Sequence, residues 1–292
     1  MYKGMMDQLC YIIWNPDIDL FTLGKFPIRY YSLMWVIGLA AAYLLVKKYF
    51  KDMKIDMERF EPLFLYCFLG TLIGARLGHC IFYDPGYYFK SLGTVIEMIL
   101  PISFTPSFHF TGYSGLASHG GTIGIFIGIL LYCRKYKVRL LTVLDLVCVA
   151  TPLTACCIRL GNLMNSEIVG KATGTDYGFV FAQLGEDFPR HPAQLYEAMA
   201  YLIIFILITA IYKRHKELVG KGFYIGFCLT AIFTFRFFVE FFKEVQSPWE
   251  EALPIDMGQI LSIPFIIAGI CLIKYSLSIR HHSIKHLTDS KR

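Results

Sequence analysis

The sequence predicts an all-α protein that crosses a membrane several times, with seven transmembrane helices. Of its 292 residues, 55% are hydrophobic and only 17% are charged, whereas about 25% are charged in a soluble domain. The apolar residues gather in runs long enough to cross a hydrocarbon core about 30 Å thick. These runs are too continuous for barrel strands, so they predict helices that satisfy their own backbone hydrogen bonds.

Seven apolar segments supply these helices. They cover residues 31–46, 60–83, 115–133, 141–164, 192–212, 222–242 and 257–275. Residues 31–278 are expected to form one membrane domain, preceded by an external segment, 1–30, and followed by a basic tail, 279–292. The two longest connections, 84–114 and 165–191, are expected to make a small cap on the outer side. The aromatic residues of the first connection suit either the membrane interface or a cap with its own core.

Lysine and arginine set the orientation of the helices. They gather after the first, third and fifth segments and in the tail, and they are sparse in the other connections. Because loops rich in Lys and Arg stay in the cytoplasm, the N-terminus is predicted outside and the C-terminus inside. The net charge of +6 therefore reflects topology, and no nucleic-acid partner is expected.

Three arginines fall inside the predicted helices, where a charge costs about 3 kcal/mol at the bilayer centre. Arg76, Arg159 and Arg236 each stand a few residues before the outer end of a helix, about 8–11 Å below the surface. His119 enters the third helix at a similar depth. The arginines could snorkel or form structural ion pairs with acidic residues of the fifth and sixth helices. Alternatively, the four groups share one layer and bind an external anion, most simply a lipid phosphate.

Neighbouring residues favour the anion site. Residues 118–121 (SHGG) open the third helix, whose positive end would face the basic layer and whose glycines would let backbone approach a ligand. Residues 70–78 repeat glycine at every fourth position, a face for tight helix packing. Glu240 lies one turn beyond Arg236 and is expected to orient it.

Several segments carry a more specific signal. They are residues 29–34 (RYYSLM), 74–78 (GARLG), 118–121 (SHGG), 159–170 (RLGNLMNSEIVG), 190–197 (RHPAQLYE), 235–242 (FRFFVEFF) and 257–259 (MGQ). In this order they resemble the phosphatidylglycerol–prolipoprotein diacylglyceryl transferase family, over residues 28–273. Ile158, Ser166 and Val169 depart from the family pattern, which commonly has Gly, Gly and Trp at these positions.

The resemblance implies transfer of the sn-1,2-diacylglyceryl group from phosphatidylglycerol to the lipobox cysteine of a preprolipoprotein signal peptide. A thioether forms and glycerol 1-phosphate leaves. The resemblance also implies no metal and no organic cofactor, and a multi-pass protein of the bacterial inner membrane with its active site towards the periplasm.

For this chemistry we predict that His119 acts as general base or orients the base, while Arg159 and Arg236 hold the phosphate as it leaves. In the alternative, His119 is structural and an arginine acts on the thiol directly. The other residues predicted to bind or orient the substrates are Tyr31, Arg76, Asn162, Glu167, Gly170, His191 and Glu240.

Two other functions would also explain buried arginines. One is an anion or lipid transporter, and the other is a non-catalytic lipid-binding membrane protein. Against a transporter, the inner halves of the helices are nearly uncharged, and no broken helices occur in two repeated halves.

Overall fold

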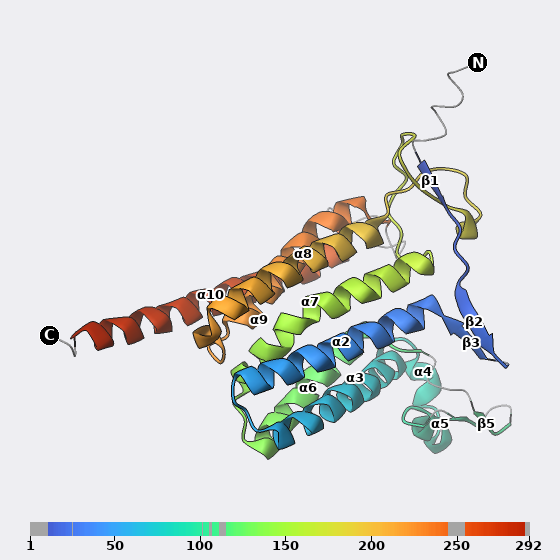
Figure 1. Cartoon of the computed structure of the whole chain (residues 1–292). Coiled ribbons are helices and arrows are strands. Elements are labelled where there is room, and N and C mark those ends of the chain that lie inside the picture. The colour runs from blue at the N-terminus through green and yellow to red at the C-terminus, as the bar shows by residue number, and fades with distance from the viewer. Residues whose placement is uncertain are drawn as a thin grey trace. The chain divides into compact units, whose positions relative to one another are not determined.

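Long helices dominate the computed structural model (Figure 1), which describes residues 11–24, 26–100, 102–104, 107–110, 115–244 and 255–289. They are α2 (Tyr30–Asp52), α3 (Phe60–Phe82), α6 (Ser118–Tyr136), α7 (Leu140–Met164), α8 (Ala193–Arg214), α9 (Phe223–Val239) and α10 (Met257–Asp289). Each corresponds to one predicted apolar segment. Within the described ranges, 6 helices are long and apolar enough to cross a membrane, and α6 is not among them. A mostly helical, polytopic membrane protein is therefore confirmed.

The last helix is longer than predicted. The apolar segment was expected to end at residue 275, but α10 continues to Asp289. Most of the predicted basic tail therefore prolongs this helix, and residues 290–292 lie outside the described part of the chain.

Short elements fill the connections. The strands are β1 (Tyr11–Trp14), β2 (Asp19–Leu23), β3 (Phe26–Arg29), β4 (Ile102–Ser103), β5 (His109–Phe110) and β6 (Gly178–Phe181). The short helices are α4 (Pro85–Tyr88) and α5 (Leu92–Glu97), with single 3-10 turns η2 (Met57–Arg59), η3 (Ala182–Leu184), η4 (Lys216–Leu218) and η5 (Glu240–Phe242). The pairs β2–β3 and β4–β5 are antiparallel, whereas β1 pairs with β6 in parallel.

The chain divides into two compact units. The smaller unit is Tyr49–Val143, and the larger combines Met1–Lys48 with Leu144–Arg292. The single membrane domain expected for residues 31–278 stays a prediction.

In the smaller unit, α3 and α6 pack through facing glycines. A Cβ atom on Gly74 would overlap the Gly120 carbonyl oxygen, and one on Gly124 would overlap that of Gly70. The tight-packing face predicted on the second helix is therefore confirmed. The expectation that Gly120 leaves room for a ligand is wrong, because Gly120 is pressed against the α3 backbone.

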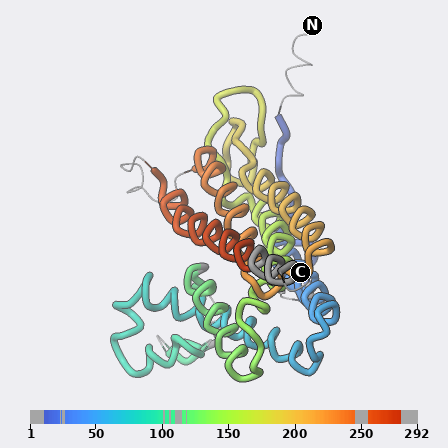
Figure 2. Tube along the Cα trace, turned by 90° about the vertical axis from the view of Figure 1, so that its left-hand side faces the viewer, coloured from blue at the N-terminus to red at the C-terminus, as the bar shows by residue number. Residues whose placement is uncertain are grey.

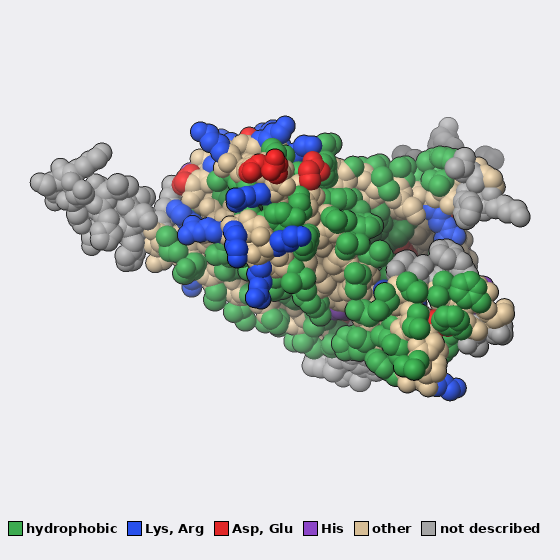
Figure 3. Space-filling model, turned by 90° about the horizontal axis from the view of Figure 1, so that it is seen from below, with side chains coloured by type: hydrophobic (Ala, Val, Ile, Leu, Met, Phe, Trp, Pro, Cys, Tyr) green, Lys and Arg blue, Asp and Glu red, His purple; other side chains and the backbone are tan. Residues whose placement is uncertain are grey.

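Basic side chains gather at one end of this α3–α6 pair. The Tyr132 hydroxyl of α6 donates to the Arg59 carbonyl, 2.6 Å away, so the start of α3 and the end of α6 lie together. Figure 3 shows Lys and Arg side chains gathered at one end of the visible face, beside a broad hydrophobic surface. The exposed basic residues of the two connections at this end are Lys51, Lys54, Arg59, Arg134, Lys135, Lys137 and Arg139.

In the larger unit, α8, α9 and α10 run side by side (Figures 1 and 2). The α9–α10 contact is close because Gly226 and Gly269 face each other. The strand β1 reaches the far end of α7, where the Trp14 indole donates to the Leu163 carbonyl at 2.8 Å. This contact anchors the N-terminal strand beside the end of α7.

A buried carboxylate joins α7 to the start of α9. Asp145 is fully buried and accepts hydrogen bonds from the backbone N–H groups of Gly220, Gly222 and Ile225 at 2.9–3.0 Å. Three donors that would otherwise be buried without partners are thereby satisfied.

Replacing this carboxylate should destabilise the protein. Asp145→Ala leaves the three donors unpaired, and we expect the free energy of unfolding to fall by about 3 kcal/mol. Denaturant unfolding of the purified protein in detergent measures this loss. Asp17→Ala, at an exposed position, is the control, and equal stability of the two variants would contradict the role assigned to Asp145.

Candidate active site

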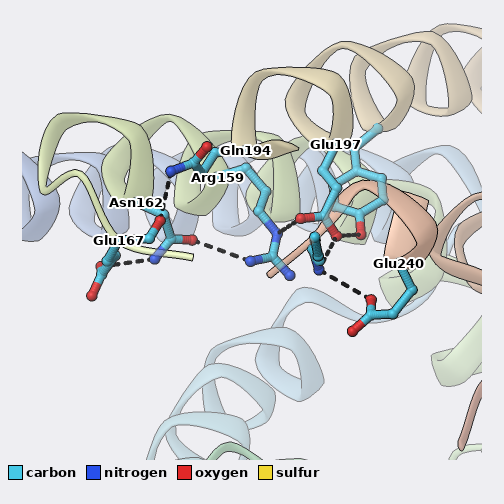
Figure 4. A network of polar contacts seen from close by, with 8 residues as sticks. Arg159, Asn162, Glu167, Gln194, Glu197 and Glu240 are labelled. Atoms are coloured by element: carbon cyan, nitrogen blue, oxygen red, sulfur yellow. Dashed lines mark hydrogen bonds and ion pairs between the residues drawn. The ribbon is translucent and has the colours of Figure 1, made fainter. Parts of the chain in front are cut away.

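The larger unit contains a polar network centred on Glu197 of α8, whose side chain is fully buried (Figure 4). Its Oε2 lies 3.0 Å from Nε of Arg159 on α7. Its Oε1 accepts hydrogen bonds from Lys243 Nζ at 3.3 Å and from the Tyr201 hydroxyl at 3.1 Å. A buried carboxylate is stable only with such partners, so α7, α8 and the segment after α9 are held together here.

The network continues from Arg159 along the C-terminal end of α7. Arg159 Nη1 donates to Asn162 Oδ1 at 3.4 Å, and Asn162 Nδ2 donates to Glu167 Oε1 at 2.8 Å. Gln194 fixes the same turn, because its Nε2 donates to the Glu167 carbonyl at 2.7 Å. Three of the predicted site residues therefore lie in one hydrogen-bonded chain.

Glu240 and Arg236, predicted on the sixth helix, do not form the expected pair. Glu240 Oε2 lies 3.4 Å from Lys243 Nζ, so its partner is this lysine instead of the expected Arg236. The guanidinium of Arg236 is partly exposed. Arg159 and Arg236 both act electrostatically on the Tyr201 hydroxyl, so both belong to the surroundings of this residue.

Gly170 and His191 meet at a tight crossing of two backbone segments. Gly170 N–H donates to the His191 carbonyl at 2.9 Å, and a Cβ on Gly170 would lie 2.7 Å from the Phe242 carbonyl oxygen. Only glycine fits such an approach. The His191 ring is held by the Tyr196 hydroxyl, 3.2 Å from its Nδ1.

Arg190 braces the same crossing from outside the membrane-spanning helices. Its guanidinium donates to the Gly170 carbonyl at 3.1 Å and pairs with Glu186 and Glu244. Hydrogen bonding to the Glu186 carboxylate raises the pKa of Arg190 above its ordinary value, so its charge is permanent.

Tyr31 stands at the start of α2, against the signature segment. A Cβ on Gly161 would lie 3.0 Å from Cδ2 of Tyr31, so the tyrosine ring packs one residue away from Asn162. The placement fits its predicted role at the site.

Arg76 and His119 belong to the smaller unit. Arg76 is 5% exposed, and its Nη2 donates to the Glu97 carbonyl at 2.9 Å. Its guanidinium carbon lies 5.2 Å from the centre of the Tyr88 ring, a cation–π contact. His119 is the second residue of α6 and is exposed. That all four basic groups share one layer stays a prediction.

The Glu97 carboxylate holds together the short elements around Arg76. It accepts hydrogen bonds from the Phe104 N–H at 2.6 Å and from the Tyr87 hydroxyl at 2.8 Å. Burial raises the pKa of Glu97, but these hydrogen bonds outweigh it and place the pKa below its ordinary value. The first outer connection therefore has an ordered core around an ionised side chain.

Sequence reasoning missed Lys243 and Tyr201. Lys243 directly follows the sixth predicted segment, yet it is 4% exposed and bridges two carboxylates. Its spacing of three residues from Glu240 on a helical turn was the available signal. Tyr201 reads as an ordinary aromatic of an apolar helix, although it follows Glu197 by one turn.

Comparison with known proteins identifies the family. A family model described as prolipoprotein diacylglyceryl transferase matches residues 19–275. The chain belongs to this transferase family. A Bacteroides fragilis relative is 56% identical over 268 residues, which cover 91% of this chain and 95% of the relative. A relative from Porphyromonas gingivalis is 42% identical, over 90% of this chain and 94% of the relative. One from Chloroherpeton thalassium is 38% identical, over 93% of this chain and 97% of the relative. All three are named phosphatidylglycerol–prolipoprotein diacylglyceryl transferase.

The transferase signature segment is strained in this chain. Ser166 has φ +51° and Ile168 has φ +59°, the left-handed region that side chains disfavour. Ser166 stands where the resemblance leads us to expect glycine, and it is 3% exposed. The turn that carries Glu167 therefore keeps its shape against a local conformational cost.

Lys243 is expected to be essential for the stability of the network. Lys243→Met leaves two carboxylates short of a cation, so the free energy of unfolding should fall by about 3–5 kcal/mol. Lys243→Arg keeps the charge and should retain most of the stability. Lys243→Met with Glu240→Gln removes one charge of each sign and should recover part of the loss. Denaturant unfolding of each variant in detergent measures these free energies, and unchanged stability of Lys243→Met would refute the bridging role.

Ser166→Gly should stabilise this transferase. Glycine adopts φ near +51° without the side-chain penalty, and we expect a gain of about 1 kcal/mol in the free energy of unfolding. Ser166→Ala, which retains a Cβ atom, is the matched control. A gain in both variants, or in neither, would show that backbone strain is not the cause.

Proposed function

We propose that this protein transfers the sn-1,2-diacylglyceryl group of phosphatidylglycerol to the lipobox cysteine thiol of a preprolipoprotein. The observation that carries the proposal is the bonded chain Arg159–Asn162–Glu167, which keeps the polar residues of the signature of a family so named. The reaction forms a bond from sulfur to the glycerol carbon and breaks the bond from that carbon to the phosphate oxygen. Glycerol 1-phosphate leaves with the electron pair, and the thiol proton passes to a base.

The network prepares Arg159 to receive the phosphate. Arg159 uses Nε for Glu197 and Nη1 for Asn162 (Figure 4). Because two of its three nitrogens are fixed, the third has a defined direction without further loss of side-chain entropy. Its side chain is 15% exposed, so a lipid phosphate can reach it.

The charges of the cluster favour an anionic ligand. Two arginines and Lys243 meet the two carboxylates of Glu197 and Glu240. With Glu167 the three cations and three carboxylates balance, but among the described residues Arg236 forms no ion pair, so its charge is available to the single negative charge of a phosphodiester. Arg236, with no partner within the cluster, supplies that charge and stabilises the leaving phosphate.

His119 is the proposed general base. The reactive form of a thiol is the thiolate, and an exposed imidazole at the start of α6 suits proton removal from an incoming peptide. Arg76 would then orient substrate from the same unit.

The proposed topology follows the charges. The α6 helix is proposed as a seventh span, with the N-terminus outside and the basic connections of the α3–α6 pair in the cytoplasm. The site would face the periplasm of a bacterial inner membrane, where lipid and signal peptide both arrive sideways. No metal and no organic cofactor is required.

One reconstituted assay tests the function. Purified protein is incubated with labelled phosphatidylglycerol and a lipobox peptide in liposomes, and the thioether product is measured. Uptake of lipid or anion without product would indicate a transporter, and binding alone would indicate a lipid-binding protein. Either outcome would refute the proposal.

Arg159→Ala and Arg236→Ala should each lower kcat by about 10²–10³, and His119→Gln should lower it by about 10²–10⁴. Arg139→Ala, at an exposed position of the α6–α7 connection, is the control for loss of a surface charge. If the single variants Arg159→Ala and His119→Gln both retained full transfer activity, the roles assigned to these residues would be ruled out.

A further inference from the structure

An apolar groove of about 640 Å³ lies beside the candidate active site. It is lined by one face of α9, from Phe227 to Phe238, by Ala200, Ile203 and Ile204 of α8, and by Ile273 of α10. Ile203 and Phe238 are 56% and 58% exposed, so the groove opens sideways on the surface that faces lipid. All of these residues belong to the larger unit.

The hydroxyl of Thr230, which lines the groove, already has a hydrogen-bond partner. Its Oγ1 donates to the Gly226 carbonyl one turn earlier at 2.8 Å. The remaining lining is aliphatic and aromatic apart from Thr234. A hydrocarbon chain would therefore find apolar contacts there without displacing any bound polar partner.

The outer part of the groove shares a wall with the polar network. Phe235 lines the groove, and its ring lies 6.5 Å from that of Tyr201, centre to centre. The Tyr201 hydroxyl in turn donates to Glu197. Arg159 and Arg236 both act electrostatically on this hydroxyl, so a phosphate held by the arginines would lie near the groove.

We propose that this groove holds an acyl chain of the lipid donor while its phosphate lies at Arg159 and Arg236. The proposal rests on the proposed function. The lining of α9 extends from Phe227 to Phe238, about 16 Å along a helix. One leaflet of the hydrocarbon core is about 15 Å deep, so a chain running inwards from the site would fill the groove along its length.

A signal-peptide helix fits the groove less well. A helix about 10 Å across fills about 120 Å³ per residue, so a volume of 640 Å³ holds about five residues. The apolar core of a signal peptide has 7–15 residues. The groove is therefore too narrow to enclose a signal-peptide helix along its length, and a single hydrocarbon chain fits it better.

Chain-length dependence of the reaction tests the proposal. Ile203→Trp fills the groove from α8, and Ala231→Phe fills it from α9, each about 8–9 Å inward of Glu197 or Arg236 along its helix. With phosphatidylglycerol carrying sixteen-carbon chains, each variant should raise KM about tenfold, the loss expected for about two methylene groups. With four-carbon chains, which end before the filled region, KM should change less than about threefold. Ala40→Phe, at an exposed position of α2, should change neither.

An equal rise in KM for both donors, or the same rise in the Ala40→Phe control, would overturn the proposal. Absence of transfer by the unaltered protein would instead count against the proposed function. In that case a binding measurement tests whether the groove holds an acyl chain. Phosphatidylglycerol with a photoreactive diazirine on one acyl chain is irradiated with the full-length protein in vesicles, and labelled peptides are mapped.

Labelling should concentrate on residues 227–238, and excess phosphatidylglycerol should abolish it. A phosphatidylcholine probe should label residues 227–238 no more strongly than it labels the exposed face of α2. Equal labelling by both probes would mean that bulk lipid covers the groove. Protection by a lipobox peptide but not by phosphatidylglycerol would assign it to the signal peptide, and either result would refute the proposal.

Discussion

The carboxylate of Glu197 has no contact with solvent, and the rest of the site follows from the need to match its charge. An ionised carboxylate in an apolar helix bundle is tolerated only when cations and hydrogen-bond donors surround it. Arg159, Lys243 and Tyr201 meet that need from three directions. Because these residues come from α7, from the end of α9 and from α8 itself, one charge fixes the spacing of the helices that carry the chemistry. It also fixes Nε of Arg159, while Asn162 holds Nη1.

The helices could be predicted from the sequence because hydropathy over a long window reports the average environment of a segment. The Arg159–Asn162 pairing was also predictable, since residues three apart lie on one helical face. The glycine repeat of α3 predicted a close contact, and α6 provides it through Gly120 and Gly124. The signature segment and its neighbours identified the family, which the match over residues 19–275 confirms.

The partners of individual charges could not be predicted. Lys243 sits just beyond an apolar segment, and its spacing from Glu240 suggests a local pair but does not reveal the second contact with the buried Glu197. The pairing of β1 with β6 is equally hidden, because it joins short strands that are far apart in the chain. Gly120 was assigned to a ligand because a glycine pattern alone does not reveal whether backbone or substrate approaches it. In each case the missing information is a tertiary contact.

The parallel pairing of β1 with β6 has a consequence for the order in which this protein assembles. The strand β1 precedes every membrane helix in the chain, yet its partner follows α7, and the Trp14 contact at the end of α7 spans 149 residues. During synthesis from the N-terminus, β1 must therefore wait until the helices up to α7 have entered the bilayer and β6 has emerged on the same side. Contacts of such long range form slowly. The strand β1 thus docks only after α7 and β6 have been made, although it is the first of the described strands to be synthesised.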